Sequence, residues 1–136
     1  MTQAVDASVW LALFWPDDPH HAASRAWMEE QVTAGERLLI PASALAEVAA
    51  PIRRRTGDPG LAIEAVRAIL DLPGVAVIPV TEDMGRLSGE IAASMGMKSG
   101  DAVFAALAFM EHVPLVSWDS EQIGRCPSQV TARSPK

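Results

Sequence analysis

The sequence predicts an α/β protein, a three-layer α/β/α sandwich around a central and mostly parallel sheet. Short apolar runs alternate along the chain with longer segments in which apolar residues recur at helical spacing. Strands that are separated by helices are joined by right-handed crossovers, which give a parallel sheet. The strand segments are apolar on both faces, as expected when helices cover both sides of the sheet.

The elements follow in a regular order. The expected strands are residues 2–5, 38–41, 75–80 and 115–118, with a weak edge strand at 129–132. The expected helices are residues 8–15, about 20–33, 43–56, 61–72, 81–95 and 101–112. Ser43 and Thr81 are suited to cap helices, Pro51 predicts a kink, and Gly96 ends a helix. The 136 residues fit a single domain, 1–136, with a polar tail from about residue 127.

Composition limits the functional classes. With 49% apolar and 21% charged residues, the chain can bury a core and is not disordered. The single Cys126 excludes an internal disulfide framework, and with no leader segment it favours a cytoplasmic location. The apolar run at residues 9–15 is too short to span a membrane. A formal charge of -6 argues against an extended nucleic-acid footprint, but not against an enzyme whose carboxylates hold cations.

Four acidic residues stand at junctions between elements. Asp6 and Asp119 directly follow the first and fourth strands. Glu47 lies one turn into the helix after the second strand, and Asp101 begins the helix that leads to the fourth strand. In a parallel sheet these junctions share the carboxyl edge, where such folds place ligands. Four carboxylates gathered there repel each other unless a cation lies between them.

The expected cation is Mg²⁺ or Mn²⁺. These hard ions take oxygen ligands and need only a few carboxylates. A pair of such ions can activate water and stabilise the leaving oxygen of a phosphodiester, so the acids predict a phosphodiester hydrolase. A zinc pattern is not found, since His20 and His21 are adjacent and His112 stands alone.

Each acid also has a structural interpretation. Asp101 is suited to cap its helix. Glu47 lies opposite the apolar stripe of its helix, as an exposed residue would. Turn chemistry explains Asp6 and Asp119 taken singly. The functional interpretation depends on the joint placement of all four.

A dense basic run, Arg53 to Arg55, ends the third helix. Arg53, Arg54 and Arg55 would either hold RNA phosphates or interact with the negative end of the helix dipole. Both interpretations are compatible.

The first helix carries large apolar side chains, namely Trp10, Leu11, Phe14 and Trp15. They would either pack in the core or form a groove for a partner helix or a second subunit.

Four motifs, V-D-A-S-V-W, P-A-S-A-L-A-E-V, K-S-G-D-A-V-F-A-A-L-A and L-V-S-W-D, occur in this order. In them the chain resembles the PIN-domain family and its small VapC-like toxin ribonucleases, over nearly the whole length. The resemblance implies a metal-dependent endoribonuclease, the toxin of a type II toxin–antitoxin pair, that binds a cognate antitoxin and forms a homodimer. It implies a catalytic, metal-binding quartet with two supporting hydroxyls: Asp6, Glu47, Asp101 and Asp119, with Ser8 and Ser117. The segment S-E-Q-I-G-R after Asp119 departs from the family by lacking an aromatic residue.

Two other functional classes compete with this one. A non-catalytic PIN-like interaction module would keep the acids for structure or for a protein partner. A phosphatase or receiver-type phosphoacceptor usually has a second acid two residues after the first, and Ser8 occupies that position here. The endoribonuclease is the leading hypothesis and the interaction module is its alternative.

Overall fold

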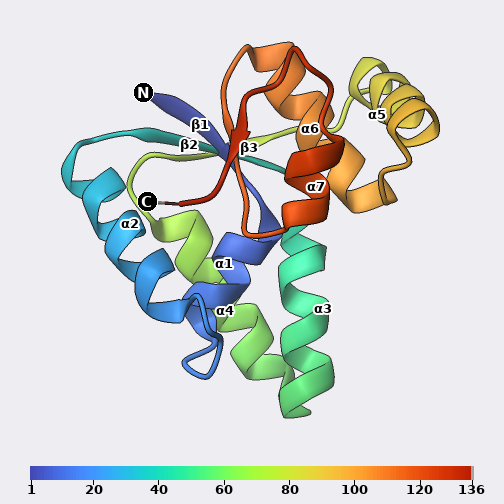
Figure 1. The fold of residues 1–136 in the computed structure, drawn as a ribbon. Coiled ribbons are helices and arrows are strands. Elements are labelled where there is room, and N and C mark those ends of the chain that lie inside the picture. Colours follow the sequence, from blue (N-terminus) through green and yellow to red (C-terminus); the bar gives the residue numbers. More distant parts are fainter. Residues whose placement is uncertain (136) are drawn as a thin grey trace.

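A central parallel sheet organises the molecule. The computed structural model describes residues 1–135. The strands are β1 Thr2–Val5, β2 Arg37–Pro41, β3 Val75–Ile78, β4 Leu115–Val116 and β5 Ala132–Arg133. Their spatial order is β3-β2-β1-β4-β5, and every pairing is parallel. The predicted sandwich around a parallel sheet is therefore confirmed, with β1 at the centre (Figure 1).

Helices cover both faces of this sheet. They are α1 Ala7–Phe14, α2 His21–Thr33, α3 Ala44–Thr56, α4 Pro59–Asp71, α5 Glu82–Met95, α6 Ser99–Glu111 and α7 Ser120–Arg125. From β1 to β3 the chain moves across the sheet in one direction, and from β3 to β5 it moves back. Because each crossover connection is right-handed, the helices α1–α4 lie on one face of the sheet and α5–α7 on the other (Figure 1). In the described part of the chain, no helix has the length and hydropathy needed to cross a membrane.

Local signals set several helix ends. Thr81 caps α5 as predicted, because its hydroxyl accepts a hydrogen bond from the Met84 backbone amide at 3.2 Å. Ser43 occupies the N-cap position of α3 as predicted, but its backbone is helical and its side chain makes no capping hydrogen bond within residues 1–135. The helix α3 continues through Pro51. Gly96 ends α5 with a positive φ of 66°, a conformation that glycine adopts without strain.

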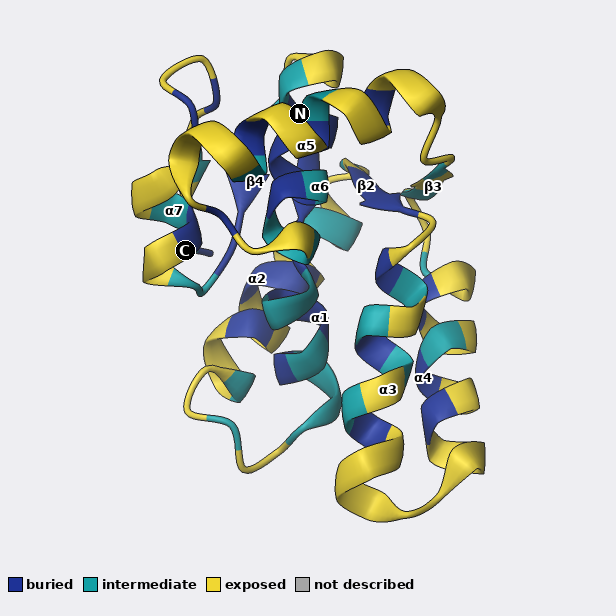
Figure 2. Cartoon of the chain, turned by 90° about the vertical axis from the view of Figure 1, so that its right-hand side faces the viewer, coloured by how far each residue is buried: buried dark blue, intermediate teal, exposed yellow. Residues whose placement is uncertain are grey.

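The core lies between the sheet and its two helical layers. Leu38, Ile40 and the middle of α6 around Phe104 and Leu107 are fully buried (Figure 2). The strand β3 differs from the prediction, because it ends at Ile78 and its residues are partly exposed. Its position at the edge of the sheet explains this, since an edge strand is covered less completely than a central one.

The last segment of the chain is more ordered than a polar tail. Val130 is buried, and β5 pairs with β4 at the edge of the sheet. The strand begins at Ala132, later than the weak strand expected at residues 129–132. Residue 136 of the predicted domain lies outside the described residues.

The large side chains of α1 divide between core and surface. Trp10 is only 1% exposed, and its indole N–H donates to the Val5 carbonyl at 3.1 Å. Leu11, Phe14 and Trp15 are partly exposed. Core packing therefore explains Trp10, whereas Phe14 and Trp15 border surface pockets.

Candidate functional site

The site is built around Asp6 at the carboxyl end of the central strand. The Asp6 backbone amide donates to the Val116 carbonyl at 2.9 Å, which places the ends of β1 and β4 side by side. The Asp6 side chain is buried, and one carboxylate oxygen, Oδ2, accepts the Ser8 backbone amide at 3.0 Å. The same oxygen accepts the Ser117 hydroxyl at 3.2 Å. Asp6 therefore both caps α1 and is held from the neighbouring strand.

The two serines connect the strand ends. The Ser117 hydroxyl also accepts the Asp119 backbone amide at 3.0 Å. The Ser8 hydroxyl accepts the Trp118 backbone amide at 3.0 Å and lies 3.3 Å from the Ser117 hydroxyl. Ser8 and Ser117 therefore position the turn that carries Asp119 next to Asp6.

Asp119 has a structural task of its own. Its Oδ1 accepts the backbone amides of Glu121 and Gln122 at 3.0 and 3.2 Å and so caps α7. Turn chemistry therefore explains the position of one oxygen of Asp119. The cap occupies only Oδ1, since both bonds go to that oxygen.

Glu47 and Asp101 are half-buried, and no donor within residues 1–135 hydrogen-bonds either carboxylate. Burial raises the pKa of Glu47, and the negative charges of Asp6 and Asp101 add to that effect. Burial likewise raises the pKa of Asp101 to about 6, reinforced by Asp6 and then Asp119. The negative charge of Asp6 therefore acts on both carboxylates, and that of Asp119 acts on Asp101, so the fold brings these acids within electrostatic range.

Two structural interpretations of these acids are excluded. The N-cap position of α6 belongs to Lys98, and Asp101 lies inside the first turn. Glu47 faces the start of α6 instead of open solvent, because a Cβ atom at Gly100 would lie 2.9 Å from its Oε1. Glycine at position 100 permits this close approach.

The negative charges of the site also act on the Cys126 thiol. Burial raises the pKa of its thiol to about 11, with further contributions from Asp101 and Asp6. The thiol is therefore protonated at neutral pH and is a poor nucleophile. Thiol chemistry is not a competing function for this site.

The donor set fits a hard divalent cation. It consists of carboxylate oxygens, and Glu47 and Asp101 have raised pKa values and no hydrogen-bond donors. Within residues 1–135, however, no group of three or more Asp, Glu, His or Cys side chains is placed so that it could hold a metal ion. Asp6 and Asp119 direct carboxylate oxygens toward amides and hydroxyls of the protein.

Gln122 is a site residue that was missed from the sequence. It is only 1% exposed, and its side-chain amide donates to Asp6 Oδ1 at 3.2 Å and to the Asp101 backbone carbonyl at 3.3 Å. Its other atom, Oε1, is buried without a hydrogen-bond partner. The segment S-E-Q-I-G-R contains Gln122 but displays no local pattern that marks it as buried.

We expect Gln122→Glu to lower the free energy of unfolding of the metal-free protein by about 1–3 kcal/mol at pH 8, because it replaces a donor to Asp6 by a charge. The loss should shrink at pH 5, where added protons neutralise carboxylates in the cluster. Urea unfolding in a chelator measures it, with the exposed Gln129→Glu as the matched control. Equal stability of Gln122→Glu and the wild type at pH 8 would show that the buried amide does not support Asp6.

The basic run at the end of α3 lies at the surface beside α1. Arg53, Arg54 and Arg55 are exposed, and within residues 1–135 none of them forms a salt bridge. The Arg55 guanidinium lies over the Trp15 ring, 4.8 Å from its centre. This contact leaves the arginines free to attract phosphates as well as to stabilise the helix end.

Solved structures share the fold. VapC20 of Mycobacterium tuberculosis, described as a sarcin–ricin loop cleaving toxin, superposes with a TM-score of 0.80 at 20% identity over 94% of this chain and 98% of its own. VapBC2 from Rickettsia felis, bound to a promoter DNA fragment, superposes with a TM-score of 0.76 at 13% identity over 100% of both chains. DNA-bound VapBC from Salmonella typhimurium superposes with a TM-score of 0.75 at 14% identity over 100% of this chain and 99% of its own.

No curated protein shows significant sequence similarity to the chain. The family model for the PIN domain matches residues 4–125, which span nearly all the elements described above and all four acids. The chain therefore belongs to the PIN domain family.

Proposed function

We propose that the protein is a Mg²⁺- or Mn²⁺-dependent endoribonuclease and the toxin of a toxin–antitoxin pair. The observation that carries the proposal is the pair of half-buried carboxylates, Glu47 and Asp101, which lie in the field of the buried Asp6 and have no hydrogen-bond donors within residues 1–135. Such an arrangement stores electrostatic repulsion that a divalent cation relieves. The likeness to VapC20, a toxin that cleaves RNA at the sarcin–ricin loop, supports the same reaction class.

Asp6, Glu47, Asp101 and Asp119 would hold the cation. When bound, it would supply Lewis-acid stabilisation of negative charge on the phosphate and a lower pKa for water. The protein's contribution is orientation. Ser8, Ser117 and Gln122 fix both oxygens of Asp6 from three different elements, so this carboxylate needs no rearrangement during the reaction.

The substrate class follows from the local distribution of charge. The chain carries 17 acidic and 11 basic residues, excluding histidine, so nonspecific attraction of RNA is weak overall. The exposed arginines 53–55 provide a local positive patch in the last turn of α3, the helix that carries Glu47 in its first turn. RNA would therefore be held at a short stretch of backbone and not along an extended face.

The proposal is tested by incubating the purified full chain with total cellular RNA in Mn²⁺, in Mg²⁺ and in chelator, and by mapping new 5′ ends. We expect internal cuts at few positions, formed only with metal. Cleavage that continues unchanged after exhaustive chelation would contradict a metal-dependent reaction. RNA that stays intact under all conditions would contradict a nuclease.

The proposed partners are a cognate antitoxin and a second copy of the chain, in the cytoplasm. Similar folds occur in VapBC complexes from Rickettsia felis and Salmonella typhimurium, both bound to DNA, which supports an antitoxin partner. Purification together with the product of a neighbouring reading frame, followed by mass measurement in solution, tests both predictions.

The alternative function, a non-catalytic PIN-like interaction module, has one observation in its favour. Asp6 and Asp119 already have hydrogen-bond donors within the protein, as structural carboxylates do. In that case the acids would not need a cation, and metal would leave the stability unchanged. The metal titration described in the Discussion separates the two functions.

A further inference from the structure

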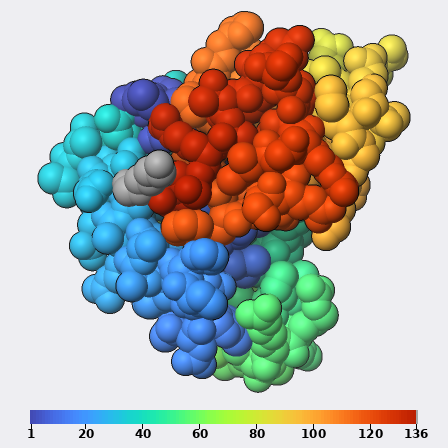
Figure 3. All heavy atoms as spheres, viewed as in Figure 1, coloured from blue at the N-terminus to red at the C-terminus, as the bar shows by residue number. Residues whose placement is uncertain are grey.

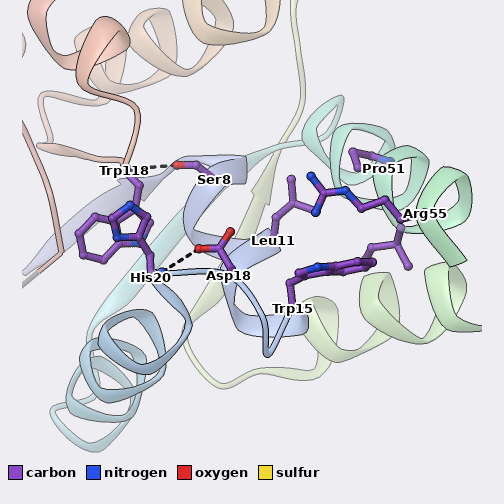
Figure 4. Close-up of a pocket in the computed structure, with 9 residues that line it drawn as sticks. Ser8, Leu11, Trp15, Asp18, His20, Pro51, Arg55 and Trp118 are labelled. Atoms are coloured by element: carbon purple, nitrogen blue, oxygen red, sulfur yellow. Dashed lines mark hydrogen bonds between the residues drawn. The ribbon is translucent and has the colours of Figure 1, made fainter.

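A pocket of about 200 Å³ is lined by Ser8, whose backbone amide donates to Asp6, but by none of the four acids themselves. Its lining includes Trp118 and His20 at one end and Trp15 and Arg55 at the other (Figure 4). The molecular surface is hollowed where the blue N-terminal helices, the green helix α3 and the orange-red C-terminal segment meet (Figure 3). The pocket is thus built from segments far apart in the sequence and has room for one small planar group.

Contacts within the protein preassemble the side chains at both ends of the pocket. The His20 ring stacks on the Trp118 indole with ring centres 4.0 Å apart and planes only 7° from parallel. The Trp118 indole N–H donates to the Ser24 hydroxyl at 2.6 Å, which fixes the orientation of that ring. Opposite them, the Arg55 guanidinium lies over the Trp15 ring. Two aromatic surfaces with a cation are the elements that protein sites use to stack nucleobases.

Ser8 joins the pocket to the acids. It lines the pocket, and its hydroxyl accepts the Trp118 backbone amide. Its own backbone amide donates to Asp6 Oδ2 at 3.0 Å. Because one residue belongs to both places, a nucleotide whose phosphate lies at the carboxylates would have its base at this pocket.

We propose that this pocket binds one unpaired nucleobase of the RNA, adjacent to the phosphate at the acidic site. The inference rests on the proposed function and adds a subsite to it. Asp18, whose Oδ1 accepts the His20 backbone amide at 2.8 Å, supplies the acidic group of the pocket and is suited to accept an amino group of a base. Arg55, with the two arginines before it, lies where the next phosphate would pass.

A neighbouring groove shows the contrast with a protein-binding surface. On its other side, Trp15 also lines a groove with Phe14, Leu61 and Ala65, which is mostly apolar and suits an apolar side chain. The His20–Trp118 pocket instead combines a ring stack, a cation and a carboxylate beside the acidic site. These differences favour RNA over a protein segment as its occupant.

The test uses the full chain with Asp101→Asn, which is expected to bind RNA without cleaving it. Fluorescein-labelled hexanucleotides of A, C, G or U, and a hexamer of abasic ribose phosphates, are titrated in Mg²⁺ and followed by fluorescence anisotropy. We expect at least one base-containing hexamer to bind about 5- to 150-fold more tightly than the abasic one, as one stacked base provides. Equal affinity for all five would overturn the proposal.

Variants locate the effect in the pocket. His20→Ala, which removes an exposed ring, should remove most of the preference for the base and leave abasic binding unchanged. Arg55→Gln should weaken both kinds of hexamer, whereas the exposed Arg67→Gln on α4 is the matched control for charge. A preserved preference for the base in His20→Ala would overturn the assignment.

The outcome is separable from the nuclease proposal. If wild-type protein cleaves RNA and His20→Ala changes neither binding nor cleavage, the nucleobase subsite fails and the nuclease stands. If RNA is never cleaved but His20 sets the preference for bases, the subsite stands and the nuclease fails. If the pocket variants release a copurified protein and leave RNA binding unchanged, the pocket is a protein-docking surface and the proposal is overturned.

Discussion

Asp101→Asn is expected to lower the rate of RNA cleavage by about a thousand-fold while the fold is kept. Asp101 is one of two site carboxylates without a hydrogen-bond donor within residues 1–135, so its negative charge is the property that the site uses. Stabilisation by a coordinated cation amounts to several kcal/mol, and each 1.36 kcal/mol changes a rate tenfold. The cleavage rate of a mapped RNA substrate measures the effect.

The same substitution should raise the stability of the metal-free protein. The pKa of Asp101 is raised from 3.8 to about 6 in the folded state, so the folded state binds the proton more tightly than the unfolded chain does. Folding stability therefore falls as the pH rises from about 4 to about 6, and the penalty is complete above that range. Because the side chain is half-exposed and screened by solvent, about 1 kcal/mol is expected at pH 8.

Urea unfolding of wild type and Asp101→Asn in chelator, from pH 4 to pH 8, measures this difference. The two proteins should be closest at pH 4 and differ most at pH 8. The exposed Glu90→Gln on α5 removes one negative charge elsewhere and is the matched control. If Asp101→Asn cleaves RNA at the wild-type rate, Asp101 does not belong to the catalytic site. If Asp101→Asn is less stable than the wild type at pH 8, the role of Asp101 is structural.

Millimolar Mn²⁺ should raise the melting temperature of the wild-type protein by about 10 °C. A ligand that binds only the folded state adds about 2.7 kcal/mol at a concentration 100 times its dissociation constant. In a domain of 136 residues, each kcal/mol shifts the melting temperature by about 4 °C. Relief of repulsion among the acids provides the driving force.

The dependence on pH distinguishes this site from adventitious binding. Protons compete with the cation for Asp101 and Glu47, whose pKa values are raised, so the thermal shift should decrease between pH 8 and pH 5. Asp6→Asn and Asp101→Asn should lose most of the shift, whereas Glu90→Gln should retain it. A wild-type protein that does not respond to millimolar Mn²⁺ would favour the interaction module.

The fold and the grouping of the acids could be predicted because both depend on patterns that the sequence displays locally. Asp6 and Asp119 follow strands, and the crossover topology alone places them at one edge. Gln122 could not be predicted, since its burial depends on contact with Asp6, 116 positions away. The helix α7 has only six residues, too few to display a periodic pattern. The stack of His20 on Trp118 likewise joins distant segments without a local signal.

The support of Asp6 by Ser117 and Gln122 has a consequence for protein synthesis. These donors lie 111 and 116 positions after the side chain that they hold, and β4, the neighbour of β1 on that side, also comes late in the chain. A polypeptide released early from the ribosome, before Leu115, would carry three of the acids but neither the strand β4 nor the donors Ser117 and Gln122. Interrupted translation therefore leaves fragments without a formed site, and only the finished product can present one.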